Sequence, residues 1–195
     1  FECASIIQRL LAGEKVNHQG LVQVHEAKLF TLPEIIPAFS CAGLTETTAR
    51  WAGTWADGFL TVHESIDGLR KVIEAFRETA GDHKPITVKM TFSYARDERI
   101  AREHAFEQWR TNCIPINEMG ALTYVEDFDR AAESVTLDAV LKRVPVSSEL
   151  SHFSRLIQET IDLGVSAIVL HNVCTLQEQF IEDFGANVLP TLKCS

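Results

Sequence analysis

The regular alternation of short apolar segments with amphipathic segments, from about residue 38 onward, is the feature that most constrains how this chain can fold. Short apolar runs bounded by turn residues predict buried strands, and apolar residues repeated at three- and four-residue spacing predict helices. Strands and helices that alternate in this way form βαβ units around a parallel sheet. The sequence therefore predicts an α/β fold.

The predicted elements extend over most of the chain. The expected strands are residues 38–42, 58–62, 85–94 and 166–173. The expected helices are residues 46–56, 66–80, 97–112, 151–163 and 176–189. Residues 114–146 are less regular, and we expect an insertion with one or two helices, around 125–134 and 137–144. All these elements are expected to lie in a single domain of residues 1–195.

The segment before this alternation has different patterns. Residues 1–12 carry apolar residues at helical spacing and are followed by Gly13, a common helix stop. No capping residue precedes them, so the chain is expected to begin inside a helix. Polar and apolar residues alternate over residues 16–30, around Gly20, which predicts a short hairpin or excursion.

The number of βα units favours part of a barrel. The sequence contains about four such units, whereas a closed (β/α)8 barrel needs eight strands and about 250 residues. An open four-stranded sheet would be complete on its own, but the sequence lacks the Gly-rich phosphate loop usual for such a sheet. Together with the missing helix start, this favours the C-terminal half of a TIM-like (β/α)8 barrel, about strands five to eight, with a helical insertion.

The segment that joins the strand at 38–42 to the next helix is suited to bind a phosphate group. Backbone N–H groups and the positive end of the helix dipole would face an anion there. Thr45 and Thr48 place two hydroxyl groups at the helix entrance, and the small residues Ala42 and Gly43 permit close approach of a ligand. The alternative interpretation is that Thr45 only caps the helix.

Several segments, taken together, show a family resemblance. Residues 45–59, with the sequence TETTARWAGTWADGF, resemble the segment after the fifth strand of luciferase-like monooxygenases and deazaflavin-dependent oxidoreductases. Residues 2–20, 26–37 and 170–190 are similar to the family's helix after strand four, its entry to strand five, and its last strand with the closing helix. The resemblance therefore covers nearly the whole chain in the right order.

The resemblance implies redox chemistry on a small organic substrate, with FMN or the deazaflavin coenzyme F-420 (F420) as cofactor. It implies that Thr45 and Thr48 help to bind the cofactor phosphate, and that Leu44 contributes only its backbone. The other residues that would line the cofactor are Ala42, Gly43, Gly58 and Thr61. In this family the first four strands give other essential contacts, including acidic and histidine residues near the ring, so no general acid or base is assigned here.

His171 and Asn172 stand near the end of the last predicted strand, where barrel active sites lie. A hydrogen-bonding or catalytic role toward substrate or cofactor is one interpretation, and a satisfied polar pair at a strand end is the other. Cys41 lies at another strand end and could pair with His171 as a nucleophile. A small buried cysteine is the simpler interpretation.

Charge and composition exclude several functional classes. A formal net charge of -9 argues against a nucleic-acid or anionic-membrane surface, and no apolar run approaches the ~20 residues of a membrane span. The histidines and cysteines show no metal-ligand spacing, so no metal is expected. The five cysteines are scattered and include no CxxC pair, which predicts reduced thiols and a cytoplasmic protein.

The remaining conspicuous side chains are expected to be structural. The tryptophans on predicted helices are interpreted as packing anchors, and they are Trp51, Trp55 and Trp109. One predicted helix carries a solvated, ion-paired face made of Glu98, Arg99, Arg102 and Glu103.

Three functional hypotheses remain open. The chain is part of an active flavin or deazaflavin oxidoreductase whose N-terminal half is missing, or a non-catalytic module that binds a cofactor or associates with itself. Because a half-barrel exposes two strand edges, the second hypothesis predicts a homo-oligomer. The third is an unrelated phosphate-binding lyase, for which Lys89, in the middle of a predicted strand, is the sole strand candidate.

Overall fold

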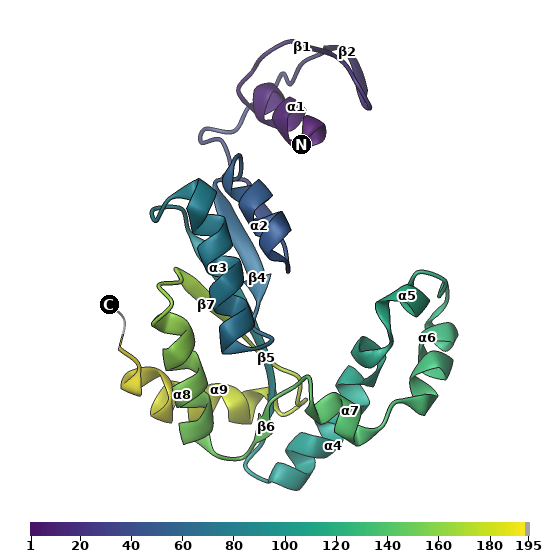
Figure 1. The fold of residues 1–195 in the computed structure, drawn as a ribbon, viewed down its shortest axis with the longest axis vertical. Helices are drawn as coiled ribbons and strands as arrows, with labels where there is room; N and C mark the ends of the chain where they lie inside the picture. Colours follow the sequence, from purple (N-terminus) through teal and green to yellow (C-terminus); the bar gives the residue numbers. More distant parts are fainter. Residues whose placement is uncertain (194–195) are drawn as a thin grey trace.

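A parallel sheet lies at the centre of the computed structural model, which describes residues 1–193 (Figure 1). Its main strands are, in spatial order, β3 (Ser40–Ala42), β4 (Gly58–Val62), β5 (Ile86–Tyr94) and β7 (Ala167–Asn172). All neighbouring strands are parallel, with Phe59 opposite Ile86 and Thr87 opposite Ala167. Within the described residues β3 and β7 each pair on one side only, so the sheet is open, as expected for a half-barrel.

Side chains alternate between the two faces of the sheet. On β5 every second residue is buried, and these residues are Ile86, Val88, Met90, Phe92 and Tyr94. Among residues 1–193 no helix layer covers the opposite face, and Leu60 and Val169 remain 44% and 52% exposed there. We call this second side the bare face. In a closed barrel this face would line the interior.

Helices cover the other face of the sheet in two groups (Figure 1). The first group is α2 (Glu46–Gly53) and α3 (Ile66–Ala80), and the second is α8 (Leu150–Ile161) and α9 (Gln177–Asn187). Phe76 of α3 stacks on Phe59 at 4.9 Å between ring centroids. Near the other end of β5, Phe92 packs against Phe153 and Phe184. Two apolar cores therefore fix the helices to one sheet.

Polar capping residues and glycines in the sequence determine where these helices begin and end. The Ser65 hydroxyl accepts a hydrogen bond from the Gly68 amide at the start of α3. Gly81, with φ of 75°, ends the same helix, because a positive φ favours glycine. Gly164, with φ of 73°, follows α8 in the same way.

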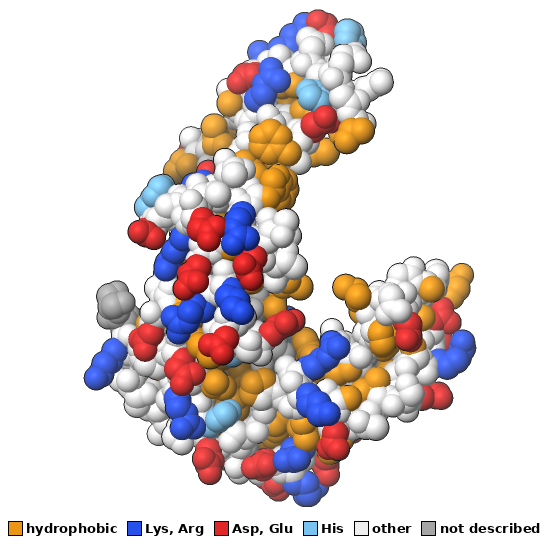
Figure 2. All heavy atoms as spheres, in the orientation of Figure 1, with side chains coloured by type: hydrophobic (Ala, Val, Ile, Leu, Met, Phe, Trp, Pro, Cys, Tyr) orange, Lys and Arg blue, Asp and Glu red, His pale blue; other side chains and the backbone are white. Residues whose placement is uncertain are grey.

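The N-terminal arm is separate from the sheet (Figure 1). It consists of α1 (Glu2–Leu11), β1 (Val16–Gln19) and β2 (Gln23–Ala27). The two strands form an antiparallel hairpin, which confirms the pattern read from the sequence. Phe1 contacts Trp55 edge-on beyond the end of α2, and Figure 2 shows apolar side chains gathered where this arm joins the sheet.

A helical arm extends from the other end of the sheet (Figure 1). It contains α4 (Glu98–Trp109), α5 (Ile116–Met119), α6 (Val125–Ala131) and α7 (Leu137–Leu141), with short 3-10 turns at Arg110–Cys113 and Ala132–Ser134. A further 3-10 turn, η3 (Leu189–Thr191), follows α9. The arm returns through β6 (Val146–Ser147), which pairs with the last two residues of β5. The sequence did not predict β6, because a two-residue strand is too short to produce a periodic pattern.

The described residues, 1–193, also bear on membrane, metal and cysteine chemistry. No helix there is long and apolar enough to cross a membrane. No group of three or more His, Cys, Asp or Glu side chains comes together as a metal site would require. Cys3, Cys41, Cys113 and Cys174 are free thiols, whereas Cys194 lies outside the described residues.

Candidate functional site

The connection from β3 to α2 lies at the carboxyl edge of the parallel sheet. Thr45 caps α2, because its Oγ1 accepts a hydrogen bond from the Thr48 amide at 3.2 Å. The same Thr45 hydroxyl donates to Thr48 Oγ1 at 3.0 Å. The two hydroxyl groups predicted at the helix entrance therefore lie together and bond to each other. The amides of Glu46 and Thr47, in the first turn, have no intrahelical acceptor.

Small residues bring this connection close to the sheet. The Gly43 amide donates to the Leu60 carbonyl at 3.0 Å, which continues the pairing of β3 with β4. A Cβ atom at Gly43 would lie 2.6 Å from Thr48 Cγ2, so glycine lets α2 begin tightly against the strand end. Ala42 and Leu44 are both exposed. The backbone here is thus accessible from solvent.

A cavity of about 280 Å³ opens between the starts of α2 and α3, and we call it the corner cavity. Leu44, Thr45 and the buried Thr61 line it, so three predicted residues meet there. Three charged side chains also line it, namely Glu46, Glu64 and Lys71. The cavity offers polar donors and one cation, opposed by two carboxylates.

Gly58 is not brought into this group. It is the first residue of β4 and lies opposite Ser40, at the amino end of the sheet. At about 3.3 Å per residue it stands about 10 Å from Thr61 along the strand. Its environment is Ser40 and Pro85, atoms of which would lie 3.0–3.2 Å from a Cβ atom at this position. The structure therefore separates Gly58 from the corner cavity.

Asn172 joins the ends of β5 and β7. Its Oδ1 accepts hydrogen bonds from the Tyr94 amide at 2.8 Å and the Cys174 amide at 3.3 Å. Its Nδ2 donates to the Tyr94 carbonyl at 3.2 Å. The side chain is buried, and these bonds engage both its oxygen and its nitrogen. The geometry fits the interpretation of Asn172 as a satisfied polar residue at a strand end.

His171 points to the bare face and belongs to a group that sequence reasoning missed. Its Nδ1 lies 3.4 Å from Thr91 Oγ1, and its ring meets Trp109 edge-on at 5.3 Å. Lys89 Nζ stands 5.5 Å from the centroid of the Trp109 ring. Burial, and then the charge of Lys89, lowers the pKa of His171. We call Lys89, Thr91, Trp109 and His171 the Lys89 cluster.

Among the described residues, neither strand-end cysteine forms a hydrogen bond with His171. Cys41 shares a face with Phe59 and packs into the helix-covered core, on the opposite side from His171. Cys174 instead lies 3.1 Å from His104 Nδ1, which Thr175 Oγ1 also approaches at 3.1 Å. Burial raises the pKa of the Cys174 thiol, so this pair favours a neutral thiol rather than a nucleophilic thiolate.

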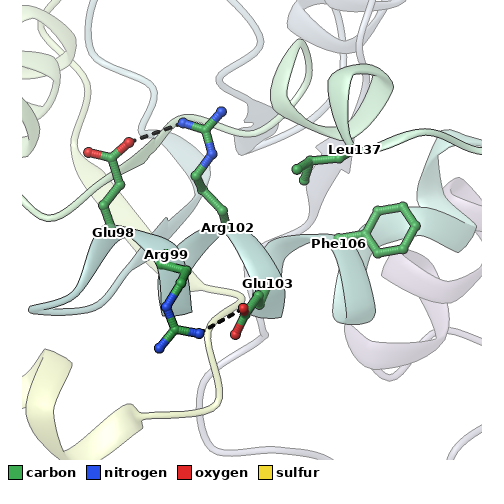
Figure 3. A pocket seen from close by; sticks show the side chains of 6 residues that line it. All are labelled: Glu98, Arg99, Arg102, Glu103, Phe106 and Leu137. Atoms are coloured by element: carbon green, nitrogen blue, oxygen red, sulfur yellow. Dashed lines mark hydrogen bonds and ion pairs between the residues drawn. The ribbon is translucent and has the colours of Figure 1, made fainter.

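The predicted ion-paired face lies on α4. Figure 3 shows Arg102 bonded to Glu98 and Arg99 bonded to Glu103, at 3.1 Å and 2.8 Å. Phe106 and Leu137 complete a surface cavity of about 460 Å³ beside these pairs. The four charges neutralise one another in pairs at i,i+4 spacing, as is typical of a solvated helix surface.

A charged network fixes α9 to the end of β5. Arg96 donates two hydrogen bonds to Asp183, at 2.8 Å and 2.7 Å, and the Tyr94 hydroxyl donates a third at 2.6 Å. The bonds from Arg96, followed by that from Tyr94, lower the pKa of Asp183. Burial and the carboxylate raise the pKa of Tyr94 to about 12. The network contributes stability only while Asp183 is ionised.

We expect the Asp183 network to make stability depend on acid pH. Because the pKa of folded Asp183 is lowered, its contribution is complete above the unfolded value of about 3.9 and disappears as pH falls through the folded value. Between about pH 5 and pH 2, wild type should lose about 1 kcal/mol more unfolding free energy than Asp183→Asn, because solvent screens the exposed Arg96. Urea denaturation at several pH values measures this difference.

Asp82→Asn, at a 96% exposed side chain, is the control and should follow wild type. Parallel pH profiles for wild type and Asp183→Asn would contradict the prediction.

Comparisons with known proteins agree with this architecture. The sequence profile described as luciferase-like monooxygenase matches residues 2–167. The chain is 27% identical over 203 residues to an F420-dependent glucose-6-phosphate dehydrogenase from Amycolatopsis mediterranei, and 26% identical over 204 residues to the protein of that name from Intrasporangium calvum. In both cases 98% of this chain is covered, and the chain spans 60% of the relative's length.

Solved structures show the same fold. An F420-dependent secondary alcohol dehydrogenase in complex with an F420-acetone adduct superposes with a TM-score of 0.81 at 20% identity, over 98% of this chain and 60% of that protein. The oxygenating constituent of 3,6-diketocamphane monooxygenase from Pseudomonas putida, in complex with FMN, gives a TM-score of 0.62 at 16% identity, over 99% and 62%. With its family profile covering residues 2–167, the chain belongs to the luciferase-like monooxygenase family.

Proposed function

We propose that this chain supplies the cofactor-phosphate side of the site in an F420- or FMN-dependent oxidoreductase that acts on a small organic substrate. The observation that carries the proposal is the β3–α2 connection at the carboxyl edge of the sheet. There Ala42 and Gly43 leave the backbone accessible, and the first-turn amides of α2 have no intrahelical acceptor. Family membership and the cofactors named for its relatives support the same assignment.

The corner cavity and the first turn of α2 beside it fit a phosphate group through backbone amides more than through charges. The amides of Glu46 and Thr47 would donate to phosphate oxygens, aided by the positive end of the helix dipole. Lys71 would add a cation, while Glu46 and Glu64 would repel the same group. When bound, the flavin or deazaflavin ring supplies the hydride chemistry. This chain's residues anchor and orient the cofactor, and we assign no general acid or base among them.

Binding of the cofactors to the purified chain tests the proposal. Titration with FMN and, separately, with F420, followed by the fluorescence of each cofactor, should give saturable binding of at least one of them. A complete lack of saturable binding for both cofactors would overturn the proposal for this chain. Binding that is unaffected by changes in the corner cavity would overturn the assignment of the phosphate corner.

We expect Glu64→Gln to strengthen cofactor binding. The substitution removes one of the two carboxylates that face the phosphate in the corner cavity. At the distances between charges that are typical of protein surfaces, removal of one such repulsion should tighten binding by about threefold to tenfold at low salt. The effect should be smaller at high salt. Glu126→Gln, at an exposed position on α6, provides the matched control with no expected change. Equal affinities for the two variants would contradict the prediction.

A self-associating half-barrel is the second candidate, and a specific observation favours it. Within residues 1–193, β3 and β7 each leave one edge unpaired, and the bare face exposes Leu60 and Val169. Strand edges and apolar faces of this kind favour association. Light scattering that gives the mass of a dimer supports this candidate, and a monomer at high concentration excludes it.

A further inference from the structure

We propose that the Lys89 cluster is a second binding site, which takes an oxyanion group, a phosphate or a carboxylate, of a small molecule. The site lies on the bare face and shares no residue with the corner cavity. That the anion belongs to the substrate rests on the proposed function, whereas the binding of an oxyanion does not.

The sheet register brings the cluster together. Lys89 lies opposite Val169, and Thr91 lies opposite His171, on adjacent parallel strands. Paired residues in a sheet share a face, so these four side chains lie on one side while Val88, Met90 and Phe92 are buried on the other. Trp109, at the end of α4, closes over the same face. Three separate elements therefore converge on one point.

Lys89 is held in place by an aromatic ring rather than by a carboxylate. Its Nζ stands 5.5 Å from the centroid of the Trp109 ring, in the range of a cation–π contact. Among residues 1–193 it forms no ion pair. An ammonium group carries three donors, and the ring satisfies none of them as a hydrogen-bond acceptor would. The charge is therefore positioned and available to an anion.

His171 adds a second polar contact beside the ammonium group. Its lowered pKa keeps the imidazole neutral near neutral pH, and a neutral imidazole donates one hydrogen bond. Two members of the cluster, Trp109 and His171, line a cavity of about 400 Å³, whereas Lys89 and Thr91 are not part of its lining. This volume is in the range of small-molecule pockets. The cluster thus combines one cation, one neutral donor and an aromatic wall, and two of its members border a cavity.

An oxyanion is the ligand that this combination favours. The chain has a net charge of -9, so its overall field repels anions and only a local cation can attract one. Lys89 stands beside Trp109 and opposite Val169, neither of which carries a charge, so these two neighbours do not neutralise its ammonium group. A cationic ligand would meet Lys89 with like charge. The geometry therefore points to phosphate or carboxylate oxygens.

Nuclear magnetic resonance titrations test this site directly. Inorganic phosphate and acetate are added separately to the chain at constant ionic strength, with chloride as the replaced anion. Saturable shifts of the His171 imidazole and Trp109 indole resonances with either anion are expected, and His171→Gln identifies the imidazole signal. Shifts with phosphate alone indicate a phosphate group, and shifts with acetate alone indicate a carboxylate. The absence of saturable shifts with both anions overturns the proposal.

Two lysine variants complete the test. Lys89→Met should weaken anion binding at least about tenfold, the loss of one charge-assisted hydrogen bond, while Lys142→Met on the helical arm should leave it unchanged. Equal anion affinity in Lys89→Met and wild type overturns the assignment. Cofactor titration of Lys89→Met separates the two proposals. In Lys89→Met, lost anion binding with retained cofactor binding supports this site as independent. In wild type, absent cofactor binding with intact anion binding counts against the proposed function alone.

Discussion

Replacement of Phe92 with alanine is expected to lower the free energy of unfolding by about 3–5 kcal/mol. Phe92 is fully buried at the centre of an aromatic group between β5 and the helices α8 and α9. Its ring lies 4.8 Å from that of Phe153 and stacks on that of Phe184 at 5.3 Å. Alanine would remove these contacts and leave a cavity that the parallel sheet cannot close by small movements.

Urea denaturation measures this effect, and Phe30 offers a matched control. Phe30 is 92% exposed, so Phe30→Ala should change the unfolding free energy by less than about 0.5 kcal/mol. The contrast separates burial from the loss of a phenyl ring in general. A loss below about 1 kcal/mol for Phe92→Ala would show that this core is far less tightly packed than the structure indicates.

Gly53→Ala is expected to destabilise the chain by about 1–3 kcal/mol, although alanine is ordinarily the better helix residue. Gly53 ends α2 where that helix crosses α3. A Cβ atom there would clash with Thr79 Oγ1 and lie 2.7 Å from the Phe76 carbonyl. The Thr79 hydroxyl already donates to the Arg50 carbonyl at 2.7 Å, so it is not free to move away. The two helices would have to separate.

Gly185→Ala is the natural counterpart to this substitution. Gly185 lies within α9, and a Cβ atom there would meet nothing within 4 Å. We therefore expect the opposite sign, a gain of about 0.5–1 kcal/mol, measured in the same urea titrations. If both variants were stabilised, the close approach of α2 to α3 would be wrong.

Local signals account for what the sequence predicted well. The alternation of β5 and the spacing of α3, with Ser65 before the helix and Gly81 after it, are properties of neighbouring residues. Such patterns can be recognised in the sequence without any knowledge of tertiary contacts. The alternation of elements also predicted the parallel sheet, because few other arrangements bury both kinds of surface. The family resemblance then identified which half of the barrel is present.

Long-range geometry accounts for what the sequence did not predict. The sequence indicates a packing anchor at Trp109 and a mid-strand residue at Lys89, yet the sheet register and the position of α4 bring both close to His171. Nothing in the local pattern of α4 indicates that its last residue reaches the bare face. Gly58 and Thr61 share one strand, and only the direction of that strand shows that Gly58 lies away from the corner cavity. Assignment of the site therefore needs contacts between residues that are distant in sequence.

The late return of the chain to β7 has a consequence for the order of folding. Thr91 and His171 face each other across 80 positions of sequence, whereas β4 and β5 are joined by a single helix. Loop-closure entropy grows with the logarithm of length, so docking of β7 costs about 1 kcal/mol more than a pairing one third as distant. High contact order of this kind also slows folding. We expect β3, β4 and β5 to assemble first. The two strands that carry the Lys89 cluster, β5 and β7, therefore come together only in the last and slowest pairing.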